Sequence, residues 1–275
     1  MTNITFQGAL GAYSHIACEN IFPNGNYIPA DTFEDAMELV KNNKADYAVI
    51  PIENSNAGRV TDVYFLLPQT NLYIVGEYFL RIEHQLLALP NVKIKDIKNV
   101  ASHPQALSQC SGFIKKHKLK PMSHIDTAKS CLDIIEKDDK TTAVIASKKA
   151  AEIYNMNILA SNIENDNNNT TRFLVMSRNI NIPQQDGNNY ISSLIFDVKH
   201  RSSSLYKALG AFAENNINIT KLESYVLDGN FVSARFYIEI EGHCEDVHVK
   251  KSLEKLKLNT NNIHFLGTYL SYQHR

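Results

Sequence analysis

The chain has 275 residues, of which 44% are hydrophobic and 21% charged, and 28 basic against 29 acidic residues leave a net charge of −1. This composition is typical of a globular protein, the length favours two domains, and the charge argues against a dominant nucleic-acid-binding surface while leaving room for a local basic patch. There is no apolar run of the roughly 18–20 residues that a membrane helix needs, and residues 1–6 lack the features of a signal peptide. We therefore expect a soluble, cytoplasmic protein that binds neither nucleic acid nor a membrane.

The cysteines and histidines show no metal-binding spacing. Cys18, Cys110, Cys131 and Cys244 are far apart and form no C-x-x-C pair, and the ten histidines form no H-E-x-x-H motif. This pattern indicates neither a zinc site nor a disulfide framework. We expect no metal site, and four buried cysteines.

The first 180 residues alternate short strands with helices. The predicted strands are 4–7, 27–29, 47–50, a strand at 100, 142–146 and 173–176, and the predicted helices are 14–22, 33–41, 104–116, 127–136 and 148–154. Thr32, followed three residues later by Asp35, predicts the N-cap of one helix. The alternation predicts an α/β domain over residues 1–180 with mainly parallel strands. Such sheets bind ligands at the carboxyl ends of their strands.

A different pattern follows the polar stretch 178–189, which is typical of a linker. The predicted elements are the strands 190–198, 217–226, 231–239 and 264–270 and the helices 203–214 and 246–256, with a turn at Asp228-Gly229. This βαββαβ order is that of a ferredoxin-like unit. We expect a second domain over residues 190–270 that serves regulation or dimerisation.

Two polar loops follow predicted strands near the start of the chain. In the loop 8–14 the backbone N–H groups and Ser14 would face an anion at a helix N-terminus, although a simple tight turn explains the glycines equally well. The loop 50–58 ends a buried strand with Glu53, Asn54 and Ser55 and continues to Gly58. An Asx-type turn is the alternative interpretation there.

Two further loops carry hydrogen-bond donors. In Ser102-His103-Pro104-Gln105 a strand ends and a helix begins, and Gln105 and Gln109 share one helical face. The stretch 169–173 places two threonine hydroxyls beside an arginine, which suggests a donor and an anion clamp. The alternative for His103 is a purely structural role, and the alternative for the stretch 169–173 is a solvated start of a strand. Because the sequence lacks a Ser-His-Asp triad signature and a Walker loop, the donors favour binding a small polyanion and stabilising departing negative charge.

Three motifs in this order resemble the prephenate dehydratase family. They are Ile52-Glu53-Asn54-Ser55 with Gly58, Ser102-His103-Pro104-Gln105-Ala106 with Gln109-Cys110, and Thr171-Arg172-Phe173. Residues 190–270 resemble the ACT domain that follows in that family. The resemblance implies a cofactor-free lyase of phenylalanine biosynthesis, in which prephenate loses water and carbon dioxide to give phenylpyruvate. It also implies a catalytic part of two α/β lobes, similar to type 2 periplasmic binding proteins, with a cleft between them.

The resemblance also implies roles for individual residues. The family assigns the donor at the leaving hydroxyl to the threonine of the third motif, here Thr171. The motifs and the first loop together supply the expected substrate-binding residues: Ser14, Asn54, Ser55, Gly58, Ser102, His103, Gln105, Gln109, Arg172 and Phe173.

The ACT-like region departs from the family pattern. Where the family typically has Gly-Ala-Leu and Glu-Ser-Arg-Pro, this chain has Ser203-Ser204-Leu205 and Glu223-Ser224-Tyr225-Val226. We expect phenylalanine to bind at Ser203, Ser204, Leu205, Glu223 and Ser224, between two copies in a homodimer or homotetramer. The binding should be weaker than where both motifs are intact, because glycine permits closer backbone approach. A domain kept only for dimerisation is the alternative.

Two other functions stay open. Arogenate dehydratase acts on the amino analogue of the same substrate, and the motifs do not separate the two. A binding protein that kept the bilobal cleft without turnover is the other alternative. Such a binder has no need of a hydroxyl donor like Thr171, and the expected absence of a signal peptide counts against a periplasmic solute binder.

Overall fold

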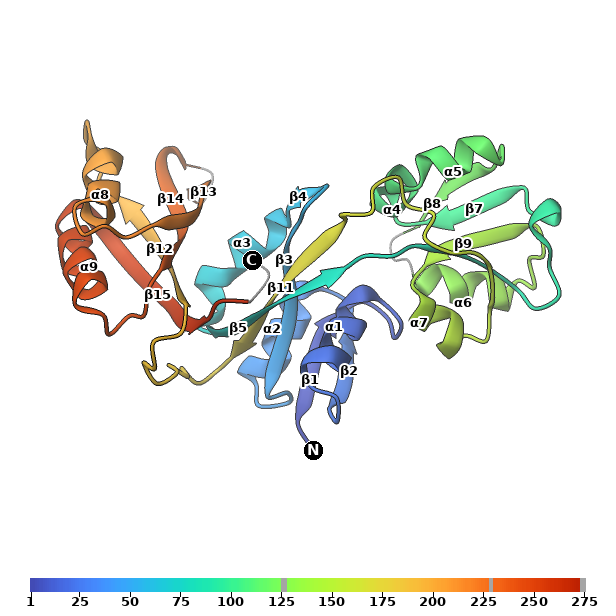
Figure 1. Cartoon of the computed structure of the whole chain (residues 1–275), viewed down its shortest axis with the longest axis horizontal. Coiled ribbons are helices and arrows are strands. Elements are labelled where there is room, and N and C mark those ends of the chain that lie inside the picture. Colours follow the sequence, from blue (N-terminus) through green and yellow to red (C-terminus); the bar gives the residue numbers. More distant parts are fainter. Residues whose placement is uncertain (125–127, 228–229, 273–275) are drawn as a thin grey trace. The chain divides into compact units, whose positions relative to one another are not determined.

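The structure is a computed structural model that describes residues 1–124, 128–227 and 230–272 (Figure 1). The turn expected at Asp228-Gly229 and the helix start expected at Thr127 lie outside these residues. Contacts along the chain define two compact units, unit 1 with residues 1–60 and 78–173, and unit 2 with residues 61–77 and 174–275.

The first sheet has six strands in the order β2-β1-β3-β11-β5, with β4 paired to β3. Its strands are β1 (Asn3–Gln7), β2 (Asn26–Ala30), β3 (Tyr47–Asn54), β4 (Gly58–Arg59), β5 (Tyr73–Arg81) and β11 (Thr170–Ser177), and its helices are α1 (Tyr13–Ile21) and α2 (Phe33–Lys41). Strand β1 runs parallel to both β2 and β3. Thr32 and Asp35 form a capping box at α2, which confirms the predicted N-cap.

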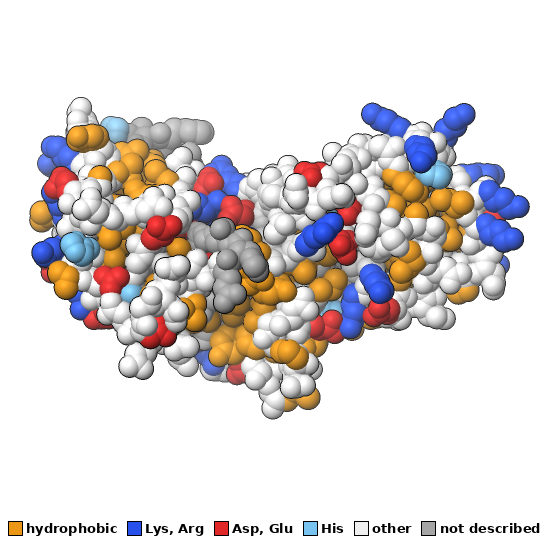
Figure 2. Space-filling model, viewed as in Figure 1, with side chains coloured by type: hydrophobic (Ala, Val, Ile, Leu, Met, Phe, Trp, Pro, Cys, Tyr) orange, Lys and Arg blue, Asp and Glu red, His pale blue; other side chains and the backbone are white. Residues whose placement is uncertain are grey.

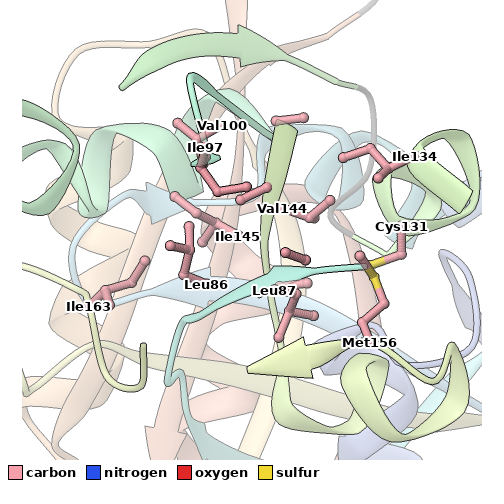
Figure 3. Close-up of a cluster of buried hydrophobic side chains, with 14 of the residues drawn as sticks. Leu86, Leu87, Ile97, Val100, Cys131, Ile134, Val144, Ile145, Met156 and Ile163 are labelled. Atoms are coloured by element: carbon pink, nitrogen blue, oxygen red, sulfur yellow. The ribbon is translucent and has the colours of Figure 1, made fainter. Parts of the chain in front are cut away.

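The second sheet lies wholly within unit 1, in the order β10-β6-β9-β7-β8. Its elements are the strands β6 (Gln85–Ala88), β7 (Asn99–Ser102), β8 (Lys120–Ser123), β9 (Thr142–Ala146) and β10 (Asn157–Ala160), the 3₁₀ turn Ile94–Asp96, and the helices α4 (Pro104–Gln109), α5 (Ser111–Lys116), α6 (Lys129–Glu136) and α7 (Lys148–Ile153). Figure 3 shows Leu86, Val144 and Ile145 from its strands among the residues of one buried cluster. Strand β7 is parallel to β8 and β9, whereas β6 is antiparallel to β9.

The single helix predicted over residues 104–116 is wrong, because the structure has two helices that meet at Cys110. The cause is the side chain of Asn165. Its Oδ1 accepts from the Gly112 N–H at 3.0 Å, and its Nδ2 donates to the Ser108 carbonyl at 3.3 Å. A continuous helix would join those two backbone groups directly, and a side chain inserted into the ladder breaks it.

Helix α5 and strand β8 carry exposed lysines. Lys115, Lys116, Lys118 and Lys120 all lie on the surface, and Figure 2 shows blue side chains gathered where Figure 1 draws α5 and β8. These four lysines form a local basic patch on a chain of nearly zero net charge. Local positive potential of this kind raises the encounter rate with small anions.

The third sheet has the order β13-β14-β12-β15 and is antiparallel throughout. Its elements are β12 (Tyr190–Val198), α8 (Ser204–Ala213), β13 (Ile219–Leu227), β14 (Asn230–Glu241), α9 (Val247–Asn259) and β15 (Thr260–Leu270). The predicted βαββαβ order is confirmed. With the two preceding sheets, it confirms the predicted α/β fold class with a small ferredoxin-like C-terminal part.

Unit 2 also contains α3 (Thr61–Thr70) and the first part of β5, which the sequence did not predict. The ring of Tyr64 packs edge-on against Tyr237, with centroids 5.3 Å apart. Gly267 on β15 lies so close to β5 that an added Cβ would sit 2.1 Å from the Ile74 carbonyl oxygen. Residues 61–77 are therefore packed against the C-terminal sheet. In the described residues every helix is too short or too polar to cross a membrane.

Candidate active site

Asn54, the last residue of β3, anchors a buried polar network in unit 1. Its Oδ1 accepts from the backbone N–H groups of Asn56 and Ala57, both at 3.0 Å, so the Asx-type turn is present. Its Nδ2 donates to Asn169 Oδ1 at 2.7 Å and to Thr171 Oγ1 at 2.9 Å. Because backbone N–H groups can only donate, they fix which end of the Asn54 amide is the oxygen.

The same strand end is tied to the start of β11. The Ser55 N–H donates to the Thr170 carbonyl at 2.8 Å, and the Thr170 N–H donates to Ser55 Oγ at 3.0 Å. Ser55 Oγ in turn donates to the Asn168 carbonyl at 3.1 Å. These contacts hold the loop after β3 against the loop before β11, so that Asn54 and Thr171 face each other at a fixed distance.

Thr171 is a partly exposed member of this network. Its Oγ1 accepts from Asn54, and within the described part of the chain it donates to no protein group. The hydroxyl hydrogen therefore remains for a bound molecule. A hydroxyl that is held by one hydrogen bond and can donate another suits the stabilisation of a leaving oxygen.

The network continues through Gln109 at the end of α4 to His84, just before β6. Gln109 Nε2 lies 3.5 Å from Asn54 Oδ1, and its Oε1 lies 2.9 Å from His84 Nε2. His84 Nδ1 lies 2.8 Å from the hydroxyl of Tyr13, the first residue of α1. His84 is 2% exposed, and this burial lowers its pKa and keeps the ring neutral near pH 7.

Burial also raises the pKa of Tyr13 well above its ordinary value, with Cys110 and Glu164 adding to the effect. The Tyr13 hydroxyl also donates to the Glu83 carbonyl at 2.9 Å. Tyr13 is therefore a neutral donor at physiological pH. The His84 backbone N–H donates to Glu164 Oε2 at 2.9 Å, which fixes the main chain on this side of the network.

The side chains of Arg172 and Phe173 are buried in the protein interior. The Arg172 side chain is 2% exposed, its Nη1 bonds Glu53 Oε1 at 3.0 Å, and its guanidinium lies 5.8 Å from the Phe79 ring centroid. Phe173 is buried in the core around β1, β3 and α1. Both side chains are therefore buried in packing contacts, and their role in substrate binding stays a prediction.

Several other predicted residues lie outside the network. Ser102 is fully buried, and its hydroxyl donates to the Ile145 carbonyl at 2.7 Å on the neighbouring strand. His103 is exposed and caps α4, because its Nδ1 accepts from the Gln105 N–H at 3.3 Å. Ser14 is buried in the first turn of α1. Of the expected substrate-binding residues, the structure thus brings Asn54, Ser55 and Gln109 together around Thr171. Gly58, exposed on β4 with φ 79°, lies at the end of the Asn54 turn.

Sequence patterns did not predict a role for His84, Tyr13 or Asn169. Asn169 lies in the stretch 169–173, where the predicted donors were the threonines and the arginine. Tyr13 lies in the loop 8–14 but no role was predicted for it, His84 lies in none of the four loops considered, and only the fold brings the two side chains to Gln109. No group of three or more His, Cys, Asp or Glu side chains gathers in metal-binding geometry among the residues that the structure describes.

In unit 2, a hollow of about 240 Å³ lies at the start of α8. It is lined by Val198, Lys199, His200, Arg201, Ser203, Ser204, Leu205, Tyr206 and Ala234. Three of the expected effector residues thus share one hollow. Glu223 and Ser224 lie on β13, where Glu223 pairs with Lys221 at 3.5 Å. Ser203 has a φ of 63°, a left-handed conformation that favours glycine, the residue typical of the family here.

Comparison with known proteins agrees with these features. A family model, prephenate dehydratase, matches residues 4–181. The chain is 38% identical to a bifunctional N-acyl-homoserine lactone acylase/prephenate dehydratase of Komagataeibacter europaeus, over 97% of this chain and 95% of the relative. It is 39% identical to arogenate dehydratase/prephenate dehydratase 1 of Arabidopsis thaliana, over 97% of this chain and 71% of the relative.

Solved structures agree as well. The prephenate dehydratase of Arthrobacter aurescens in complex with L-Phe has a TM-score of 0.92 at 27% identity, covering 100% of this chain and 92% of that one. The fold and the donor network define an α/β hydro-lyase with a C-terminal ferredoxin-like part. The chain belongs to the prephenate dehydratase family.

Proposed function

We propose that this chain converts prephenate to phenylpyruvate, with residues 1–180 as the catalytic domain and residues 190–270 as an ACT regulatory domain. The observation that carries the proposal is the Thr171 hydroxyl, held by Asn54 at 2.9 Å and left with a hydrogen to donate. The Thr171 side chain is partly exposed, so a bound molecule can reach this hydroxyl.

The reaction needs a donor more than a nucleophile. The ring carboxylate of prephenate leaves as carbon dioxide, and the electron pair that it releases enters the ring and expels the ring hydroxyl. That oxygen takes up a proton and departs as water. The Thr171 hydroxyl donates to the departing oxygen as negative charge develops on it. Asn54 occupies an acceptor site of the same hydroxyl and thereby sets the direction of its hydrogen.

The test is product formation by the purified chain with prephenate and, separately, with arogenate. We expect phenylpyruvate from prephenate, followed by its absorbance. The relatives named for arogenate dehydratase make phenylalanine from arogenate the second candidate reaction. The similarity to an acyl-homoserine lactone acylase adds a third assay, release of free homoserine lactone. Absence of turnover with both prephenate and arogenate would refute the proposed function.

We propose further that phenylalanine binds at the α8 hollow and lowers activity. The support is the hollow itself, which three of the expected effector residues line, and the similar structure solved with L-Phe. Ser203→Gly should strengthen binding, because glycine accepts the left-handed φ and clears side-chain bulk from the hollow. Titration calorimetry of both proteins checks this, and no heat and no inhibition at millimolar phenylalanine would leave dimerisation as the role of the domain.

The proposed effector site joins two copies of the chain, so we also propose a homodimer or homotetramer. Tyr206 on α8 is 80% exposed and Leu258 on α9 is 73% exposed. Large apolar side chains on one small domain are consistent with a partner surface. Sedimentation at micromolar concentration tests the assembly, and a strictly monomeric species would contradict it.

A further inference from the structure

The hydrogen bonds of the network have a single direction. The Asn54 oxygen is fixed by two backbone N–H donors, so the atom of Gln109 that faces this oxygen must be the amide nitrogen. The Gln109 oxygen then faces His84, and His84 Nε2 must carry a hydrogen to donate to it. In a neutral ring Nδ1 is then an acceptor, and it shares the single Tyr13 hydroxyl hydrogen, at an O···N distance of 2.8 Å, with the Glu83 carbonyl oxygen.

At the other end the direction is equally fixed. The Asn54 nitrogen donates to Thr171 Oγ1, so the hydroxyl hydrogen of Thr171 points onward. His84, Gln109 and Asn54 thus each accept on one side and donate on the other. The links measure 2.8, 2.9, 3.5 and 2.9 Å.

We propose that His84 is a positioning residue for the reaction, and that it acts on Thr171 through Gln109 and Asn54 as one polarised hydrogen-bond chain. This rests on the proposed role of Thr171 as the donor. Hydrogen bonds in a chain strengthen one another in a medium of low dielectric constant. His84 is 2% exposed and Asn54 is 7% exposed, so these two members of the hydrogen-bond chain lie away from water.

The hydrogen-bond chain has two effects on Thr171. It fixes the hydroxyl rotor, because Asn54 can donate only along one side of Oγ1. It also makes Thr171 a stronger donor, because a hydroxyl that accepts a hydrogen bond donates a better one. The Gln109–Asn54 link is the longest in the chain, and links of this kind shorten when the substrate is bound. His84 itself touches no reacting atom.

The first test separates this relay, in which His84 acts on Thr171 through the hydrogen-bond chain, from a purely structural role of His84. We expect His84→Leu to lower kcat about tenfold with KM unchanged, since one link of a cooperative chain is lost. His84→Gln, which can still place an N–H near the Gln109 oxygen, should restore most of that loss. Gln109→Glu keeps the shape and accepts from His84 but cannot donate to Asn54, so kcat should fall as in His84→Leu.

A matched control is Gln85→Met. Gln85 is 4% exposed and adjacent to His84, but its side chain reaches Glu83 and Asn162 and not the chain. Its replacement should change the melting temperature as much as His84→Leu does and leave kcat within twofold. A loss of kcat in Gln85→Met equal to that in His84→Leu would refute the relay, because a general loosening of unit 1 would then explain both.

A double-mutant cycle provides the decisive readout. If His84 acts only through the Thr171 hydroxyl, His84→Leu should have no further effect on kcat in a Thr171→Val background. Independent, multiplicative losses would overturn the relay while leaving Thr171 as the donor. Wild-type kcat in Thr171→Val alone would overturn the donor role and the relay together, which distinguishes the two failures.

The tautomer can be measured in the unmodified protein, so the inference does not depend on any variant folding. Nitrogen-15 spectra of the histidine rings should show His84 neutral with its hydrogen on Nε2. A hydrogen on Nδ1 alone would reverse the direction of the chain and refute the proposal.

Discussion

Replacing Thr171 by valine should separate catalysis from stability. Valine keeps the branched shape that a strand favours and removes only the hydroxyl. The Asn54 amide loses one acceptor but keeps two, Asn169 Oδ1 at 2.7 Å and the Thr170 carbonyl at 3.2 Å. The free energy of unfolding should therefore fall by about 1 kcal/mol, the usual net value of one hydrogen bond.

The rate should change far more. Loss of one donor at a developing negative charge lowers kcat by roughly 10²–10³, or about 3–4 kcal/mol in the transition state. Thr171→Ser keeps the hydroxyl and should stay within about tenfold of the parent rate. Initial rates with prephenate and urea unfolding of the same preparations measure both quantities. The donor role of Thr171 is refuted if kcat of the valine variant falls by less than threefold. It is also refuted if the free energy of unfolding falls by as much as the activation free energy rises.

Three further variants or conditions test the structure. Arg172→Lys should lower the free energy of unfolding by about 1–3 kcal/mol and leave KM nearly unchanged, because the buried guanidinium, which can form two parallel hydrogen bonds, is replaced by an ammonium point charge. An increase in KM without a loss of stability in urea unfolding would instead support the predicted anion-binding role of Arg172. Gly267→Ala should lower the free energy of unfolding by about 3 kcal/mol, because its Cβ would lie 2.1 Å from the Ile74 carbonyl oxygen. The control is Gly76→Ala, whose Cβ would make only ordinary contacts at 3.7 Å, and equal melting temperatures of the two variants would contradict this prediction. Burial lowers the pKa of His84, so the unfolded chain binds the proton more tightly than the folded one. The contribution of neutral His84 to the free energy of unfolding is fully present above pH 6.5 and should be lost as the pH falls through the pKa of the folded state. Unfolding followed from pH 7.5 to 5 should show a smaller loss in His84→Gln.

The elements that sequence patterns predicted best are those with a local cause. The capping box of α2 and the alternating strands of the C-terminal sheet depend on neighbouring residues, and both were confirmed. The break at Cys110 could not be predicted, because the group that causes it, Asn165, is distant in sequence. The strands between residues 58 and 88 were missed because their apolar residues show neither strict alternation nor clear turn signals.

The same distinction applies to the site. Asn54 and Thr171 were named from motifs, and they meet because Asn54 ends β3 and Thr171 lies at the start of the neighbouring strand β11. Ser102 and Arg172 belong to the same motifs, yet they face the interior, since a motif does not say on which side of a strand a side chain lies. His84 and Tyr13 come together only in three dimensions. Motif spacing therefore found the reacting end of the network and missed the residues behind it.

The division of the chain into two discontinuous units has an evolutionary consequence. Strands β5 and β11 each belong partly to one unit and partly to the other, so no single cut in the gene separates the units. Tyr64 and Ile74, each 1% exposed, belong to the segment that packs on the C-terminal sheet. An ancestor that lacked residues 190–270 would have exposed these side chains to water. A gain or loss of the small domain therefore requires compensating changes in residues 61–77.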